Sequence, residues 1–260
     1  STRLKCVLIK SERIELNMNE HPLIYFIHMP KTGGSTLTTI IQKNFKKHEI
    51  LPYFHYQYDI DDVLNKVHVD ELKIIHGHYW FGLHEHFNRP FSYFTVLRHP
   101  VERVVSLYYY LTSIEGKRYD RYRNMTLDQF VMNKIEANIQ TGFLSGNLKK
   151  PSVLKAVRNL RKHFEVVGTT EQFDETLFLL GKRYGWSKLH YKRVNVTARR
   201  PKIQDIPEET IKLIKKVHSK DLIVYRYAKK CLSKQLSQLT EQEQLKLRRF
   251  KEMQKKIEKL

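Results

Sequence analysis

An apolar run from Leu23 to Met29 passes through a glycine-containing turn into a helical pattern from Ser35 to Lys47. A second apolar run, Phe91 to Leu97, leads in the same way into a helical pattern from Val101 to Ser113. Both runs contain β-branched and aromatic residues without strict alternation, which is typical of strands covered on both faces. Repeated strand-to-helix units predict an α/β fold, with a doubly wound parallel sheet flanked by helices.

Shorter patterns complete the predicted fold. Further strands are expected at Leu72 to Ile75 and at Phe164 to Gly168. Helical periodicity predicts the remaining helices at Leu127 to Lys134, Val153 to His163, Phe173 to Tyr184, Pro207 to His218 and Asp221 to Gln238. Because no Gly/Ser linker interrupts these elements, residues 1–238 are predicted to form a single domain.

Residues 239–260 are predicted to form a C-terminal helical extension. Thr240 and Glu243 match a capping box, which marks the start of a helix. Apolar residues then recur at helical spacing, and they are Phe250, Met253, Ile257 and Leu260. We expect this tail helix either to dock on the domain or to pair two subunits in a homo-oligomer.

The charge balance indicates an anionic ligand. Lysine and arginine number 47 against 27 acidic residues in a chain of 260, so the formal net charge is +20. Such an excess attracts nucleotides, acidic polysaccharides and nucleic acids alike. Charge by itself therefore names no ligand.

Cysteine usage and hydropathy bear on the compartment. Cys6 and Cys231 are too few for a disulfide framework or a four-cysteine zinc site, which favours a reducing environment. The sequence has no apolar run near the roughly 18 residues of a membrane span and no secretory signal core. We expect a bacterial cytoplasmic protein. Glycosylation sequons at Asn124 and Asn195 leave the alternative of a Golgi-lumenal protein whose membrane anchor has been trimmed off.

The turn from Pro30 to Thr36 (PKTGGST) predicts an anion site. Free N–H groups at the start of a helix attract an anion, and glycines let the backbone approach it closely. Lys31 adds a positive charge, and Ser35 and Thr36 can donate hydrogen bonds. In an ATP-binding P-loop the lysine follows the last glycine, whereas Lys31 precedes both glycines here. A plain turn capped by Ser35 or Thr36 is the alternative, although it does not account for the lysine.

This turn resembles the 5′-phosphosulfate loop of sulfotransferases that use 3′-phosphoadenosine 5′-phosphosulfate (PAPS). A second segment, Leu97 to Ser106 (LRHPVERVVS), resembles the family's 3′-phosphate segment, in which Arg-(Asp/His)-Pro-x-x-Arg and then a serine follow a strand. The similarity extends over Leu23 to Tyr227 and is greatest to the carbohydrate branch, which includes heparan sulfate 2-O- and 6-O-sulfotransferases and bacterial relatives. It implies a P-loop-like fold.

The resemblance implies the cofactor site residue by residue. The residues expected to bind the 5′-phosphosulfate are Lys31, Thr32, Gly33, Gly34, Ser35 and Thr36, and those expected to bind the 3′-phosphate are Arg98 and Ser106. The implied reaction moves the sulfuryl group of PAPS to a hydroxyl group and releases adenosine 3′,5′-bisphosphate (PAP), with no metal. Lys31 is expected to be catalytic as well, because a cation stabilises charge on the leaving phosphate.

A histidine cluster between the two segments predicts the catalytic base. Its members are His76, His78, His84 and His86. Their spacing lacks the cysteines or the helical His-Glu-x-x-His of zinc sites, so no metal is expected. The His-Gly-His ending at His78 resembles that of the 2-O-sulfotransferases and implies His78 as the base. The Gly-Leu-His ending at His84 resembles that of the 6-O-sulfotransferases and makes His84 the alternative. We prefer His78, which directly follows a predicted strand.

The acceptor is predicted to be a hydroxyl group of an oligosaccharide or polysaccharide, in particular an anionic one. Basic and aromatic residues could form a track for it or be ordinary surface, and they are Lys117, Arg118, Arg121, Arg123, Lys149, Lys150, Lys155, Tyr119, Tyr122 and Trp80. Nucleic acid is not expected. A small-molecule kinase is one alternative, but no acidic ligand for Mg²⁺ lies in the strands beside the turn. A non-catalytic polyanion binder is the other, and it would not need Lys31.

Overall fold

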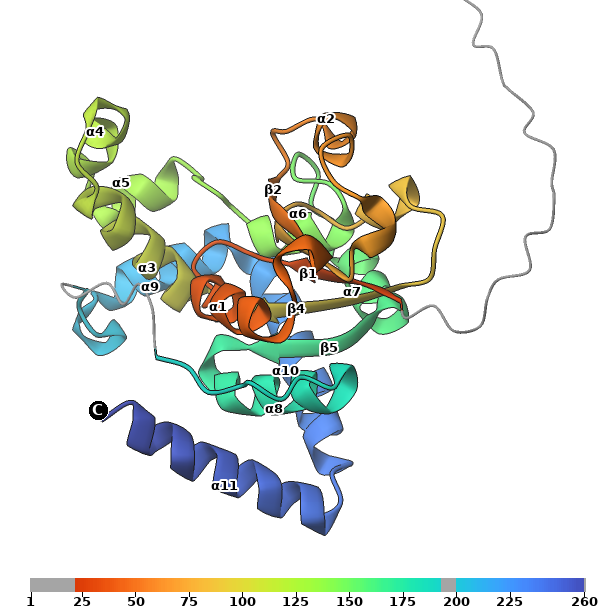
Figure 1. Ribbon diagram of the computed structural model, residues 1–260. Helices are drawn as coiled ribbons and strands as arrows, with labels where there is room; N and C mark the ends of the chain where they lie inside the picture. The colour runs from red at the N-terminus through yellow and green to blue at the C-terminus, as the bar shows by residue number, and fades with distance from the viewer. Residues whose placement is uncertain (1–21, 193–199, 260) are drawn as a thin grey trace, which may run out of the picture.

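The computed structural model describes residues 22–192 and 200–259, which form a parallel sheet with helices on both faces (Figure 1). The strands are β1 (Leu23–Ile27), β2 (Ile50–His55), β3 (Ile74–His78), β4 (Phe91–Leu97) and β5 (Phe164–Thr169). They pair in parallel in the order β2-β3-β1-β4-β5. The predicted α/β class is therefore confirmed.

Helices connect the strands and extend the chain beyond β5. The α-helices are α1 (Gly34–Asn44), α2 (Ile60–Leu64), α3 (Pro100–Ser113), α4 (Lys117–Arg123), α5 (Leu127–Met132), α6 (Ile139–Ser145), α7 (Val153–His163), α8 (Phe173–Tyr184), α9 (Glu208–Val217), α10 (Ser219–Ser237) and α11 (Glu241–Ile257). Short 3₁₀ turns are η1 (Lys47–Glu49), η2 (Val69–Glu71), η3 (Leu83–His86), η4 (Thr170–Gln172) and η5 (Ile203–Asp205).

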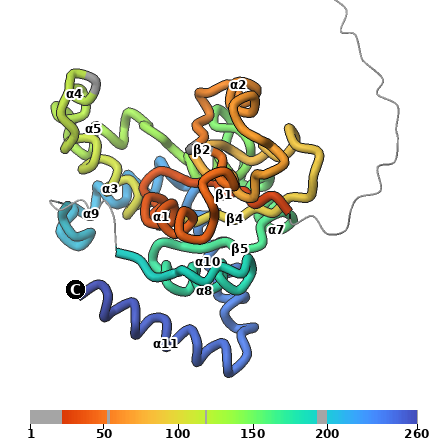
Figure 2. Tube along the Cα trace, viewed as in Figure 1, coloured from red at the N-terminus to blue at the C-terminus, as the bar shows by residue number. Residues whose placement is uncertain are grey.

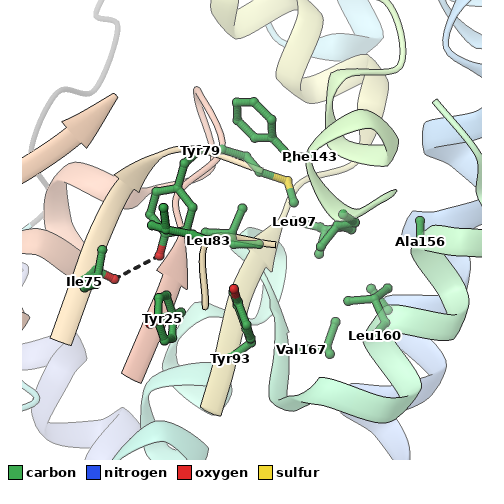
Figure 3. Packing of buried hydrophobic residues seen from close by; sticks show 14 of the residues in the cluster. Tyr25, Ile75, Tyr79, Leu83, Tyr93, Leu97, Phe143, Ala156, Leu160 and Val167 are labelled. Carbon is green, nitrogen blue, oxygen red and sulfur yellow. Dashed lines mark hydrogen bonds between the residues drawn. The ribbon is translucent and has the colours of Figure 1, made fainter. Parts of the chain in front are cut away.

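Strand β1 lies at the centre of the sheet and is buried along its whole length. Its side chains alternate between two cores, as the pleat of a strand requires. Tyr25 packs in a core with α6, α7 and α10, part of which Figure 3 shows. Phe26 packs on the opposite face with α1 and α8. The central strand thus packs against both helical layers, and this packing determines the position of the turn that follows it.

A third core lies beside the sheet, where α3, α4, α5 and α9 gather (Figure 2). Arg103 of α3 is fully buried, and its guanidinium pairs with a Glu136 carboxylate oxygen at 2.8 Å. The same guanidinium donates to the carbonyl oxygen of Glu136 at 3.2 Å. This pair ties α3 to the chain segment that enters α6.

Helix α11 docks on α8, which is one of the two expected arrangements. Thr240 and Glu243 form the predicted capping box at its start. The predicted apolar stripe is only partly right, because Met253 is 49% exposed whereas Gln254 is 1% exposed. The Gln254 amide takes the inner position because it pairs with the backbone of Tyr191. Leu260, Cys6 and the Asn195 sequon lie outside the described residues.

No helix in residues 22–192 and 200–259 combines the length and the apolarity needed to cross a bilayer.

Candidate active site

The carboxyl ends of parallel strands meet along one edge of the sheet, which is where α/β proteins bind ligands. His28 and the PKTGGST turn follow β1, and Arg98 follows β4. His55 and His78 are the last residues of β2 and β3. A cavity of about 1090 Å³ opens at this edge, and residues from all of these strand ends line it.

The turn presents the start of α1 to the cavity. Lys31 and Gly33 adopt left-handed backbone conformations, with φ of 67° and 81°. Thr32 is fully buried, and its hydroxyl donates to the Met29 carbonyl oxygen at 2.9 Å, so its side chain closes the turn and does not line the cavity. Gly33 is the N-cap, and it has no side chain that could cap α1. The N-terminus of α1, the positive end of the helix dipole, lies at the cavity, which is a favourable position for an anion.

Gly34 and His28 fit closely against each other. A Cβ atom at Gly34 would lie 1.7 Å from His28 Nε2, so only glycine fits there. Gly34, Ser35 and Thr36 all line the cavity. The N-cap of α1 is Gly33, not Ser35 or Thr36, and both of these residues lie on the cavity wall.

Hydrogen bonds with the turn, with α3 and with α6 hold Arg98 in position. Its Nη1 donates to the Lys31 carbonyl oxygen at 3.1 Å, and its Nη2 pairs with Glu102 Oε2 at 3.1 Å. The buried Gln140 amide clamps the backbone of Arg98, since it donates to the carbonyl oxygen and accepts from the N–H, each at 3.0 Å. Arg200 also pairs with Glu102. The Arg98 guanidinium is therefore held at the cavity wall, next to the turn.

Ser106 lies on α3 and lines the same cavity, where the motif predicts it. It is two helical turns beyond Arg98 along the chain. Arg103, the second arginine of the motif, is buried and does not line the cavity, and it binds Glu136. Glu136 is itself part of the cavity lining, so Arg103 supports the cavity wall from behind.

Lys31 rests against α3. Its Nζ lies 3.9 Å from the centroid of the Tyr110 ring, which is a cation–π contact. Burial, together with the nearby charges of Arg98 and Arg200, lowers the pKa of Lys31 to about 8. An anion bound beside Lys31 would offset these effects.

His78 lines the cavity together with His28 and His55. Its ring centroid lies 4.7 Å from that of His28 and 5.8 Å from that of His55. Burial, with a smaller contribution from His55, lowers the pKa of His78 to about 4. His78 is therefore neutral at physiological pH, which is the form that can accept a proton.

The other predicted histidines lie elsewhere. His76 is buried in the sheet, where burial lowers its pKa to about 4. His84 Nδ1 lies 2.9 Å from the Tyr93 hydroxyl, and its ring centroid lies 3.9 Å from that of Phe91. Neither His76 nor His84 lines the main cavity. His86 lines a second cavity, of about 510 Å³.

Several residues of the cavity were not singled out from the sequence, among them His28, His55, Tyr110 and Arg200. His28 could have been found, because it directly follows the first predicted strand. His55 could not, since the sequence did not predict β2. Arg200 is distant from the motifs in the sequence, and only the tertiary fold brings it to Glu102.

The predicted acceptor track divides between the two cavities. Tyr119, Arg121 and Tyr122 line the main cavity, whereas Trp80 and Lys155 line the second. The basic residues that line neither are Lys117, Arg123, Lys149 and Lys150. The side chain of Arg118 lies outside the described residues. Among the residues that are described, no group of three His, Cys, Asp or Glu side chains could hold a metal ion.

Comparison with models of protein families identifies the family of the chain. The model of the Sulfotransferase family matches residues 15–228, which is more than half of the chain and includes the turn, His78 and the Arg98 segment. The match ends within α10, so α11 lies beyond it. A search of curated proteins finds no match.

Proposed function

The chain belongs to the sulfotransferase family, and from that premise we propose that it moves the sulfuryl group of PAPS to a hydroxyl group of a carbohydrate. One observation carries the proposal: the turn after β1, the Arg98 segment after β4 and His78 at the end of β3 line a single cavity. Family membership also decides against the kinase and the non-catalytic polyanion binder that the sequence alone left open.

In this proposal the cavity holds both anionic ends of the donor. The N-terminus of α1 and Lys31 bind the 5′-phosphosulfate, with Ser35 and Thr36 as hydrogen-bond donors. Arg98 and Ser106 bind the 3′-phosphate. The hydrogen bond from Arg98 to the Lys31 carbonyl oxygen supports a shared ligand, because it joins the two proposed anion sites directly.

The residues of the cavity have complementary roles in the transfer. PAPS, when bound, supplies the sulfuryl group and leaves as PAP. His78 accepts the proton of the acceptor hydroxyl as its oxygen bonds to sulfur. Lys31 stabilises the negative charge that collects on the phosphate when the bond between sulfur and the bridging oxygen breaks. Burial of His78 and the positive surroundings of Lys31 support these roles.

A carbohydrate acceptor is supported by the aromatic rings around the cavity. Tyr56, Tyr119 and Tyr122 line it, and tyrosine rings offer an apolar face together with a polar edge. Both are suited to a sugar ring, which has apolar faces and a rim of hydroxyl groups.

Calorimetry with PAP and with AMP tests the donor, since the two nucleotides differ only in the 3′-phosphate. We expect PAP to bind roughly 10- to 100-fold more tightly, because charge-assisted hydrogen bonds are worth about 1.5–3 kcal/mol each. Arg98→Ala should reduce the affinity for PAP to that for AMP, while Arg161→Ala, on the exposed side of α7, should change neither. Equal affinities of the unaltered protein for PAP and AMP, or tighter binding of ATP than of PAP, would refute the proposal. Labelled PAPS with a panel of polysaccharides then tests the acceptor.

A further inference from the structure

The second cavity, of about 510 Å³, lies beside the main one and shares Tyr56 with it. Its volume is within the range of small-ligand sites, roughly 300–1,000 Å³. Residues from three places line much of it: the end of β2, the segment after β3, and α7. Two of these places, the end of β2 and the segment after β3, adjoin the histidines of the main cavity.

Aromatic side chains form one wall of this cavity. Tyr56 and Trp80 are 37% and 38% exposed, and their ring centroids lie 5.5 Å apart. Large rings that remain this exposed beside a cavity offer apolar faces to a ligand. Tyr58, also in the lining, is more exposed still.

The aromatic wall lies close to the proposed base, His78, in the structure and in the sequence. The Tyr56 N–H donates to the His78 carbonyl oxygen at 2.8 Å, and Trp80 follows His78 by two residues. A ligand that stacks on this wall would therefore place its neighbouring unit close to His78.

Two cations from α7 line the same cavity. Lys155 and Arg158 are three residues apart, so they share one side of the helix. Both are exposed to solvent, and Glu85 is the acidic residue in the lining. Gly146 and Phe81, both in the lining, are in close contact, because a Cβ atom at Gly146 would lie 2.8 Å from the Phe81 carbonyl oxygen. The cavity thus combines stacking faces with a net positive rim.

We infer that the second cavity is an acceptor subsite for an anionic sugar unit of a polysaccharide. The ring of that unit stacks on Trp80 and Tyr56, and its carboxylate or sulfate pairs with Lys155 and Arg158. The adjacent unit carries the hydroxyl group that reaches His78. With Lys155 and Arg158 against Glu85, the lining keeps a net positive charge that a neutral glycan would not compensate, so charge complementarity favours an acidic one. The inference rests on the proposed function, because it takes His78 as the place of transfer.

Calorimetry with PAP-saturated protein tests the subsite. The probe is a hexasaccharide of alternating glucuronate and N-acetylglucosamine, and maltohexaose is its neutral counterpart. We expect Lys155→Ala/Arg158→Ala to weaken hexasaccharide binding by at least about tenfold, the loss of two charge-assisted contacts. The matched control is Arg161→Ala/Lys162→Ala, which removes the same charge from exposed positions of α7 outside both cavities and should change the affinity less than about twofold.

A third variant separates stacking from charge. Trp80→Ala should weaken binding of the same hexasaccharide without changing its salt dependence, since a stacked ring carries no charge. Equal losses in the two double variants would mean diffuse attraction by surface charge and would overturn the inference. Maltohexaose binding as tight as that of the acidic probe would overturn it too, as would preferential binding of a tyrosine-containing peptide at this cavity.

Calorimetry with PAP alone distinguishes a failure of this inference from a failure of the proposed function. If PAP binds and the hexasaccharide does not, the subsite is refuted and the donor assignment stands. If PAP itself does not bind, the proposed function fails. Melting temperatures of all variants should match that of the unaltered protein, because the substituted side chains are exposed.

Discussion

At the scale of single residues, the histidines of the cluster differ in whether they line the cavity. His78 is held neutral by burial but still lines the cavity, whereas His76 is buried away from it. His84 is engaged by Tyr93 and Phe91 outside the cavity. The sequence favoured His78 over His84 because His78 follows a predicted strand, and in the structure His78 is the last residue of β3.

Replacement of His78 by alanine should lower the rate of sulfuryl transfer by roughly 10² to 10⁴, the usual contribution of a general base. The affinity for PAP should stay nearly unchanged, since the residues proposed to bind its phosphates are kept. His84→Ala is the comparison and should retain most of the turnover. Loss of activity in His84→Ala with activity kept in His78→Ala would move the base to His84.

The pH dependence of PAP binding should report on Lys31. Its pKa is lowered to about 8, so it is charged below that pH and loses its proton above it. The charged form attracts the phosphates, so the contribution of Lys31 to affinity is complete well below its pKa and falls as pH rises through it, by up to about tenfold per pH unit. Calorimetry at about pH 7 and about pH 9.5 brackets this change. Lys31→Arg should abolish it, because a guanidinium stays charged; a fall that persists in Lys31→Arg would point to another group.

At the scale of elements, the sequence predicted long periodic elements better than short or interrupted ones. Long, periodic elements were found from the sequence, and the bounds of α7 and α8 agree with the prediction. β2 was missed because Pro52 interrupts its pattern and its register with β3 shifts between Leu51 and Phe54. α4 and α6 were missed because seven residues are too few for a clear helical period.

Helix α11 supports the cavity from outside the family match. The Gln254 amide donates to the Tyr191 carbonyl oxygen at 2.7 Å and accepts from its N–H at 3.3 Å. Tyr191 lines the cavity and packs against Phe173, whose ring in turn lies beside Gly33 of the turn. α11 is therefore linked to the proposed donor site through two aromatic side chains.

Gln254→Ala should lower the free energy of unfolding by about 1–3 kcal/mol, because it removes two hydrogen bonds to the backbone of the buried Tyr191. Denaturant unfolding measures the loss. The affinity for PAP should also fall, since Tyr191 and Phe173 lose their support. Met253→Ala, at the exposed neighbouring position, is the control and should change neither quantity. Unchanged PAP affinity in a destabilised Gln254→Ala would limit α11 to a structural role.

At the scale of the whole molecule, the strand order brings together segments that are far apart in the sequence. The central position of β1 between β3 and β4 places the turn that carries Lys31 between His78 and Arg98. The sequence predicted a parallel sheet, but it did not predict the order of the strands. That order depends on tertiary packing of the two cores, which no local pattern encodes.

Donor binding should stabilise the entire fold, since the cavity joins the centre of the sheet to α3 of the third core. At a PAP concentration of about 100 times its Kd, the gain is about 2.7 kcal/mol. For a chain of this size, that gain corresponds to a rise in melting temperature of roughly 5–10 °C. AMP at the same concentration should give a smaller rise. Equal shifts with both nucleotides would contradict a role for Arg98 in binding the 3′-phosphate.

The contact between Gln254 and Tyr191 matters for anyone who shortens or fuses this chain. A version cut after Ser237 would keep the whole family match, yet it would uncover the apolar side of α8 and the backbone of Tyr191. Such a truncated enzyme should aggregate more readily and require more donor for saturation. Affinity tags are better appended after the final residue than substituted for the last helix.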